Sequence, residues 1–505
     1  MSPIRPSLSR RDLIARSAVL GAGAALTGSV GSAAAQSTPV ASPAASPIAS
    51  PVASPVASAA FLAAQDALIA DLQSQTGKRL RILSAVVGGK TPEEDALFAQ
   101  EITRLTNIEV ELVHPTADYD EKLLADLAAG VQYDLIYMNK NQMDVLVDQE
   151  VLTDLTDRIE GSAILSDPTV IPPAELDLVR YPEDTFYSVF NKFEGARMPT
   201  VRRDWMDALG LETPTTLDEF YDVLVAFRDQ DPDGNGTADT FGLSTAGVYD
   251  IQPFMSAAGV YPGYVEVDGA RTIPYATEAA IPVYEWLARL YAEKLLDPNF
   301  ATNETADMRN MFLTDRVGMV TYWDTWVGLF NNTRLTEDPN TTFVARGIPG
   351  AVAPDGSIII SRGQPSVWTI PVNAQDPDTA FRFLEWWNTI PGITLGSLGI
   401  LDHDYTLTDG TYALTDVGAE HSMDHGNPTP YNTNWVNPIG TLPGLEDAQQ
   451  ISVEYGYLAT AGPDFTPKVE PILEEFIIKA ILGELTAAEA VTGMREQLTS
   501  QGLID

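Results

Sequence analysis

The spacing of apolar and polar residues predicts alternating strands and helices in the first third of the chain. Apolar runs of strand length occur at residues 80–87 and 134–138, and residues 108–112 alternate as in a strand with one buried face. Residues 118–129 carry apolar residues at helical spacing, and Thr91 followed by Pro92 is typical of a helix start. Strands that alternate with helices of this length predict right-handed βαβ units around a parallel sheet.

After residue 181 the pattern becomes mostly helical, and proline and aromatic residues become frequent. Helices are predicted at residues 202–209, 216–230, 279–294, 308–314 and 378–388, with two more between 471 and 503. Strand-like segments return at residues 341–347, 357–360 and 366–370. The predicted fold class is therefore α/β, with an α/β first lobe, a helix-rich second lobe, and later segments that cross back.

Residues 1–35 have the three parts of a Tat signal peptide. Arg10 and Arg11 form the twin arginine, a weakly apolar stretch follows at residues 17–30, and alanines at 33–35 offer a cleavage site before Gln36. The alternative is a disordered basic tail. We expect export of a folded protein, with the mature chain beginning near Gln36.

Residues 36–60 form an Ala/Ser/Pro-rich segment with a proline at every fourth position from 39 to 55. Such a repeat cannot build a core, and proline forbids a regular helix. At about 3.1 Å per residue in a polyproline conformation, the segment reaches about 70 Å. It is predicted to be an extended tether, with the folded part beginning near Phe61 or Lys78.

Composition narrows the function classes. The chain has 505 residues, 45% of them hydrophobic, which suffices for at least two domains. A formal net charge of −40 is the wrong sign for binding nucleic acid or an anionic membrane face. There is no cysteine, which excludes disulfides, thiolate metal sites and a lipid-modified N-terminal cysteine.

The segment after the helix predicted at 216–230 resembles the first half of an EF-hand loop. Oxygen ligands recur at alternate positions, and glycines between them allow a tight turn. The twelfth position is Gly242 instead of the usual glutamate, and an Asx-turn without metal is the alternative. We expect a structural Ca²⁺ site formed by Asp231, Asp233, Asn235, the carbonyl of Thr237, and Asp239.

Catalytic motifs are weak. His421 and His425 have a spacing that suits Zn²⁺ on a helix, but no glutamate lies between them and the sequence around them is typical of a loop. No Ser-nucleophile, phosphate-binding or dinucleotide-binding motif appears in a fitting context. With 70 acidic residues, no pair of carboxylates can be singled out as a glycosidase pair. The chain is therefore predicted not to be an enzyme.

Several stretches resemble the extracellular solute-binding proteins of sugar-importing ABC transporters, in particular large oligosaccharide-binding receptors such as alginate-binding proteins. They are residues 201–220, the metal loop that follows, residues 404–410, and residues 476–505. The resemblance covers residues 79–505. Two features depart from it: Thr240 stands where relatives often have a glutamate, and there is no cysteine for a lipid anchor.

The resemblance implies two α/β lobes joined by hinge strands, with ligand held between them. Lobe one would comprise residues 78–190 and about 341–398, and lobe two about 191–340 and 399–505. The implied protein is an extracellular or cell-envelope monomer without a lipid-modified cysteine. It would deliver a carbohydrate to the membrane permease subunits of an ABC importer. An exported carbohydrate-active enzyme, or a receptor for another solute, remains the alternative.

Sugar recognition needs aromatic faces and polar groups together. A short apolar strand ends in Trp323, and we expect this residue to stack on a sugar ring, with Tyr322, Asp324 and Trp326 beside it. Since α/β sheets bind ligands at the carboxyl ends of strands, the facing wall would contain Gly88, Gly89 and Asn139. Of the other tryptophans, three are predicted as core (Trp205, Trp386, Trp387) and two as weaker stacking candidates (Trp368, Trp435).

Overall fold

The computed structural model describes residues 57–85, 91–115, 119–181, 184–192, 195–237, 239–421, 430–459, 462 and 465–505. The predicted signal peptide, nearly all of the tether, Gly88, Gly89 and His425 lie outside these residues. Within the described part, no helix has both the length and the apolar character that a membrane span needs.

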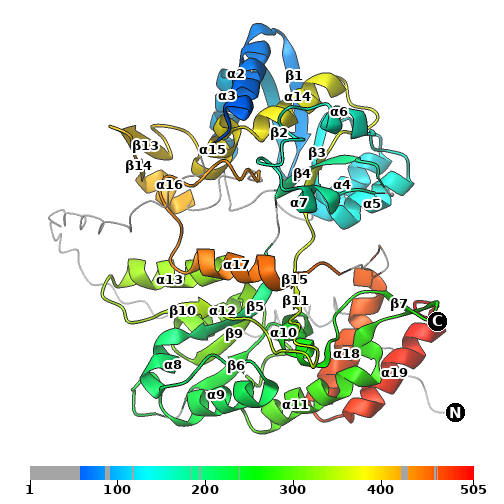
Figure 1. Ribbon diagram of the computed structural model, residues 1–505, viewed down its shortest axis with the longest axis vertical. Coiled ribbons are helices and arrows are strands. Elements are labelled where there is room, and N and C mark those ends of the chain that lie inside the picture. Colours follow the sequence, from blue (N-terminus) through cyan, green and yellow to red (C-terminus); the bar gives the residue numbers. More distant parts are fainter. Residues whose placement is uncertain are drawn as a thin grey trace, which may run out of the picture. The chain divides into compact units, whose positions relative to one another are not determined.

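The first sheet has five strands in the order β2-β1-β3-β12-β4. Four of them, β1 to β4, are labelled in Figure 1. β1 pairs in parallel with both β2 and β3, as the βαβ pattern predicted, whereas β12 lies antiparallel between β3 and β4. The strands are β1 (Lys78–Leu83), β2 (Ile108–Val113), β3 (Leu135–Asn139), β4 (Ser188–Lys192) and β12 (Ser366–Thr369). The helices of this lobe are α2 (Ala59–Ser74), α3 (Pro92–Thr106), α4 (Tyr119–Ala128), α5 (Lys140–Asp148), α6 (Thr156–Glu160), α7 (Pro173–Asp177), α14 (Pro377–Trp387) and α15 (Ile390–Leu398).

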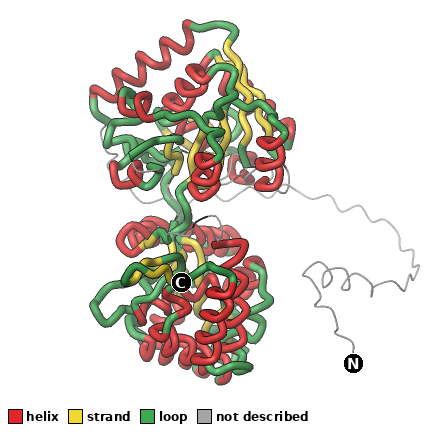
Figure 2. The backbone as a smooth tube through the Cα atoms, turned by 90° about the vertical axis from the view of Figure 1, so that its right-hand side faces the viewer, coloured by secondary structure: helices red, strands yellow, loops and turns green. Residues whose placement is uncertain are grey.

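The second sheet has four strands in the order β10-β5-β9-β6. These strands are β5 (Arg197–Arg202), β6 (Phe241–Ser244), β9 (Val317–Trp323) and β10 (Ala345–Gly347). The helices around it are α8 (Arg203–Leu209), α9 (Leu217–Asp229), α10 (Gln252–Met255), α11 (Ile281–Ala292), α12 (Thr305–Leu313), α13 (Thr325–Glu337), α17 (Leu445–Tyr455), α18 (Glu470–Ile481) and α19 (Ala487–Ser500). In Figure 2 the strands of each sheet (yellow) are surrounded by helices (red).

Three short pairs of strands complete the described structure. They are β7 (Val265–Val267) with β8 (Ala270–Thr272), β11 (Ile360–Ser361) with β15 (Gly456–Tyr457), and β13 (Tyr405–Thr408) with β14 (Thr411–Leu414), which α16 (Asp416–His421) follows.

Local sequence explains where several helices begin. Thr216 caps α9, and Glu219 bonds back to the Thr216 backbone, which is the predicted capping box. Thr91 caps α3 by accepting a hydrogen bond from the Glu94 amide at 3.3 Å, with Pro92 in the first turn. Each cap satisfies amide groups that have no partner inside the helix.

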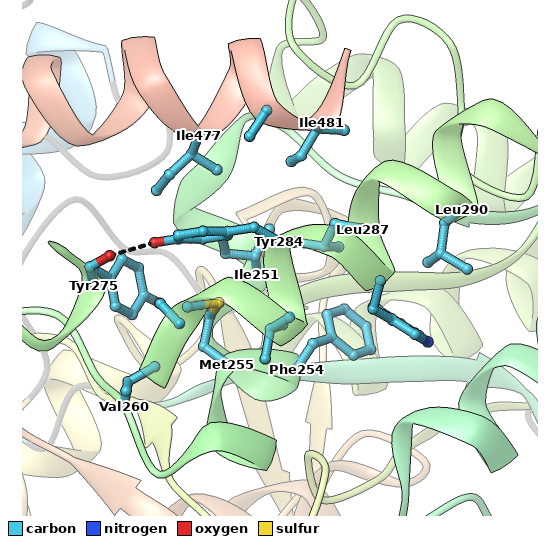
Figure 3. Packing of buried hydrophobic residues seen from close by; sticks show 14 of the residues in the cluster. Ile251, Phe254, Met255, Val260, Tyr275, Tyr284, Leu287, Leu290, Ile477 and Ile481 are labelled. Atoms are coloured by element: carbon cyan, nitrogen blue, oxygen red, sulfur yellow. Dashed lines mark hydrogen bonds between the residues drawn. The ribbon is translucent and has the colours of Figure 1, made fainter. Parts of the chain in front are cut away.

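Each sheet has its own hydrophobic core. In the second lobe, α10, α11 and α18 bury Phe254, Tyr284 and Ile477 together (Figure 3). The Tyr284 hydroxyl donates to the Tyr275 carbonyl at 2.8 Å, so this buried polar group is satisfied. The core assignment of Trp205, Trp386 and Trp387 is confirmed, since each exposes 2% or less of its surface.

One tryptophan assignment is wrong. Trp368, a weaker stacking candidate, lies on β12 in the middle of the first sheet and exposes only 2% of its surface. Its indole donates a 3.0 Å hydrogen bond to the Asn191 side chain, so the ring is part of the core. Trp435 is half-buried and donates to Thr394 at 3.0 Å.

The chain changes lobes at positions that differ from the predicted boundaries. β10 pairs with β5, and Ile348 packs in the second core, so the return to the first sheet comes after β11, near residue 362, and not at 341. Ile400 and Tyr431 pack against the first core, so the second lobe resumes after them instead of at 399. Helix α2 begins at Ala59 and buries Phe61 in the first core.

Candidate ligand-binding site

An arginine surrounded by aromatic rings marks the end of β9. Trp323 is the last residue of β9 and pairs in register with Arg197, the first residue of β5. The Arg197 guanidinium carbon lies 4.7 Å from the Trp323 ring centroid, 5.1 Å from that of Tyr322 and 4.6 Å from that of Tyr249. Stacking of this kind fixes the guanidinium and orients the rings. We call Arg197, Tyr249, Tyr322 and Trp323 the arginine–aromatic cluster.

A buried carboxylate holds the arginine in place. Asp250 is fully buried, forms an ion pair with Arg197, and accepts a 2.9 Å hydrogen bond from the Ala246 amide. Burial raises the pKa of Asp250 to about 6, although Arg197 lowers it. The native state therefore holds a proton that the unfolded chain releases between pH 3.8 and about 6. Stability from this group is highest below that window and falls as the pH rises through it.

The Arg197 side chain keeps one donor unused. Its Nε atom is buried and has no hydrogen-bond partner, although the side chain as a whole is 11% exposed. A buried donor without a partner is costly, and such groups are concentrated at functional sites. The cluster thus combines three aromatic rings with a positively charged guanidinium group that is held in place by Asp250.

Asp324, a predicted site residue, is buried and engaged within the protein. Its carboxylate accepts hydrogen bonds from the Ser452 hydroxyl at 2.7 Å and the Thr325 amide at 2.6 Å. A Cβ on Gly195 would lie 2.1 Å from the same carboxylate, so only glycine fits there. Burial raises the pKa of Asp324 against these hydrogen bonds. Asp324 joins β9 and α13 to α17, next to the segment that enters β5.

The other predicted residues of this wall differ in exposure. Trp323 is half-buried, whereas Tyr322 exposes only 7% of its surface. Trp326 is half-buried on α13, and the Arg309 guanidinium lies 4.0 Å above its ring. An arginine therefore lies over one face of each tryptophan, Arg197 over Trp323 and Arg309 over Trp326, and Trp323 is the one that belongs to the cluster around Arg197.

On the predicted facing wall, Asn139 caps α5. Its side chain accepts a 3.0 Å hydrogen bond from the Gln142 amide, and the Gln142 side chain bonds back to the Asn139 amide. The capping role occupies the side-chain oxygen that a ligand hydroxyl would need. Gly88 and Gly89 lie outside the described residues.

A cavity of about 140 Å³ adjoins the cluster in the second lobe. Tyr249 belongs to both, since it lines the cavity and contacts Arg197. The cavity lies between the loop 246–249 after β6 and helix α18, with Ser361 of β11 at its edge. Its other lining residues are Pro262, Tyr275, Phe465, Glu470, Leu473, Glu474 and Ile477.

Sequence reasoning missed Arg197, Tyr249 and Asp250. Arg197 and Asp250 are 53 positions apart, and neither belongs to a recognisable motif. One signal was available: Arg197 is the first strand residue after the chain leaves the first sheet, where cleft residues of two-lobed proteins are found.

The predicted metal loop folds around its own acidic groups. Asp231 Oδ2 accepts from the Gly236 amide at 3.0 Å, and the Asn235 amide nitrogen donates to Asp233 Oδ2 at 2.6 Å. Asp231 Oδ1 is buried without a partner. Burial first, and then the charges of Asp231 and Asp239, raise the pKa of Asp233.

These features fit a cation, because an orphaned carboxylate oxygen and mutually repelling carboxylates are both relieved by a positive ion. The carboxylates of the loop are not arranged around one point as metal ligands would be. In the described part of the chain, no three His, Cys, Asp or Glu side chains lie close enough together to hold a metal ion. Thr237 and Asp239 are exposed at the end of the loop.

The described histidines form no zinc pair with each other. His114 is buried beside Asp95 at 2.9 Å, and His403 lies 3.6 Å from Glu94. The His421 side chain and His425 lie outside what the structure describes.

The sequence of the chain places it in a known family. A model described as bacterial extracellular solute-binding protein matches residues 88–391, and the chain belongs to this family. The lipoprotein LipO of Bacillus subtilis is 25% identical over 226 residues, which cover 42% of this chain and 44% of LipO. The chain spans less than half the length of each curated relative it matches, with 44%, 48% and 38% covered.

Solved structures share the fold. An HMO-binding, ABC-transporter-associated solute-binding protein from Bifidobacterium longum infantis has a TM-score of 0.64 and 18% identity, over 85% of this chain and 96% of that one. The alginate-binding protein AlgQ2, described without calcium ion, has a TM-score of 0.63 and 18% identity over the same shares. The predicted α/β fold of two-lobed periplasmic binding proteins is confirmed. The family and these similar proteins are named as binding proteins.

Proposed function

We propose that the protein is an extracellular receptor that captures a carbohydrate at the arginine–aromatic cluster. The observation that carries this proposal is the half-buried ring of Trp323 beside Arg197, together with Tyr249, which contacts the same arginine and lines a ring-sized cavity. Aromatic faces stack on the C–H patches of sugars, and guanidinium donors bond their hydroxyl oxygens. Names of similar proteins, which include binders of alginate, fructooligosaccharide and polygalacturonan, support this ligand class.

The receptor would deliver its ligand, as a monomer, to the membrane permease subunits of an ABC importer. Similar proteins named as parts of ABC transporters support this partner. The twin-arginine segment supports export through the Tat route, and the lack of cysteine argues against a lipid anchor. Closure of the lobes on the ligand would use the connections between them, two of which pair at Ala196 and Arg362.

The family to which the chain belongs is named for solute binding, which favours a binding role over catalysis. The two buried carboxylates nearest the cluster, Asp250 and Asp324, are both engaged by an arginine or by hydrogen bonds. Neither is therefore available as a general acid or base toward a sugar. An exported carbohydrate-active enzyme and a receptor for another solute are the competing proposals.

A panel of oligosaccharides separates these proposals. At a concentration about 100 times Kd, the bound sugar adds about 2.7 kcal/mol to the free energy of unfolding and raises the melting temperature by about 3 °C. We expect such a shift with at least one member and no change in that sugar on overnight incubation, followed by chromatography. A shortened product would favour the enzyme, and a shift only with peptides or other solutes would favour the third proposal.

We also propose that Asp231, Asp233, Asn235, Thr237 and Asp239 hold Ca²⁺, which would neutralise the loop and stabilise the fold without taking part in ligand chemistry. Free calcium at about 100 times Kd should add about 2.7 kcal/mol of stability. We expect chelation by EGTA to lower the melting temperature, and Asp231→Asn to abolish this difference. An Asp207→Asn variant, altered at an exposed helix position, is the control and should keep the response. An equal melting temperature with calcium and with EGTA contradicts the site.

A further inference from the structure

The cavity beside Tyr249 has two chemically different walls. One wall is aromatic and apolar, with Tyr249, Pro262 and Phe465. The other is the first two turns of α18, which contribute the carboxylates of Glu470 and Glu474. Among the described residues that line the cavity, there is no Lys, Arg or His.

The size of the cavity suits one ring. Its volume is about 140 Å³. A cavity of about 150 Å³ engineered in another protein is known to hold benzene, so the space corresponds to one six-membered ring. Tyr249 exposes 45% of its surface and offers a face on which such a ring can stack.

The negative charge of this wall is not compensated. Neither Glu470 nor Glu474 has an ion-pair partner in the described part of the chain. The nearby cation, Arg197, is paired with the buried Asp250. Burial raises the pKa of Glu470, against a hydrogen bond from Thr466, and the charge of Glu474 raises it further. The site as a whole therefore has a local excess of negative charge.

We propose that this cavity is a subsite for a sugar ring that carries hydroxyl or protonated amino groups, and that it rejects a ring that carries a carboxylate. The inference rests on the proposed function and adds the substrate class to it. Ionised carboxylates accept hydrogen bonds from hydroxyl and ammonium groups and have no donor to offer in return. A uronic acid would place a like charge beside two carboxylates with no cation in the cavity wall, which is a repulsive element of specificity.

Calorimetric titration with three sets of trisaccharides tests the subsite. The sets are neutral (cellotriose, maltotriose, xylotriose), amine-bearing (the β-1,4-linked glucosamine trimer) and acidic (the trimers of galacturonic, mannuronic and guluronic acid). We expect the tightest ligand in the first two sets, with every acidic trimer at least about tenfold weaker in 50 mM salt. The difference in affinity between the acidic trimers and the other two sets should be smaller at 500 mM salt, because dissolved ions screen the repulsion between carboxylates.

A double variant identifies the charges responsible. We expect Glu470→Gln combined with Glu474→Gln to reduce the discrimination against acidic trimers by about tenfold and to weaken binding of the amine-bearing trimer. The matched control is Glu475→Gln on the same helix, since Glu475 pairs with Lys479 at 2.6 Å and does not line the cavity. The control variant should show the same ratios of affinity between neutral, amine-bearing and acidic trimers as the unmodified protein.

Each outcome decides between the claims. An acidic trimer as the tightest ligand, or unchanged ratios in the double variant, overturns the subsite and leaves sugar capture intact. Binding of no trisaccharide of any set contradicts the proposed function, and the subsite with it.

Discussion

Replacing Asp250 with Ala will lower the free energy of unfolding by about 3–5 kcal/mol, because it removes the buried acceptors of Arg197 and of the Ala246 amide. The Asp250 side chain is fully buried, and its partner Arg197 is only 11% exposed. The substitution leaves the guanidinium and the Ala246 amide without an acceptor in a buried site. Asn should cost less than Ala, because the raised pKa of Asp250 means that the fold favours a neutral side chain of this shape. Urea denaturation at pH 7.5, well above the Asp250 pKa of about 6, measures the loss.

Two further variants show whether the pair serves stability or binding. Asp207→Asn removes an exposed partner of Arg203 and should cost less than about 1 kcal/mol. Arg197→Met combined with Asp250→Asn should recover most of the stability, since apolar replacement of a buried ion pair is often neutral or favourable. If the recovered variant no longer binds sugar, the arginine is present for the ligand. A loss below about 1 kcal/mol in Asp250→Ala alone would contradict the role of this buried pair in stability.

Replacing Trp323 with Ala will weaken saccharide binding by about 1–3 kcal/mol, or about 5- to 150-fold, as expected for an aromatic anchor. Folding should be largely retained because Trp323 is half-buried at the end of its strand. Calorimetry with the saccharide that gives the largest thermal shift measures the affinity, and a urea curve measures the stability.

Trp386→Ala provides the opposite pattern. Trp386 is fully buried in the first core, so its truncation should cost about 3–5 kcal/mol of stability without changing affinity per folded molecule. If Trp323→Ala behaves in this way instead, Trp323 is a core residue and the ligand binds elsewhere.

Features set by near neighbours in sequence could be predicted. The helix starts at Thr91 and Thr216 follow from side chains within three positions of the cap. The strands at Lys78–Leu83 and Ile108–Val113 follow from apolar spacing. The antiparallel insertion of β12 could not be predicted, because its pairing with β3 and β4 depends on residues more than 170 positions away.

The candidate site was predictable only in part for the same reason. Trp323 was found because it ends an apolar strand, whereas its neighbours Arg197 and Tyr249 come from other segments. Trp368 was wrongly predicted as a stacking candidate, because edge strands and interior strands can have the same spacing of apolar and aromatic residues. The structure places its strand, β12, between β3 and β4. Asp324 directly follows the strand that ends at Trp323. That its carboxylate is used inside the protein could not be predicted, because the hydrogen bond that it accepts comes from Ser452, 128 positions away.

The crystal structure of the protein with the tightest-binding saccharide tests the central claim most directly. The account predicts a sugar ring stacked on Trp323, a hydrogen bond from the Arg197 guanidinium, and a neighbouring ring against Tyr249. A saccharide bound away from these three residues would contradict it.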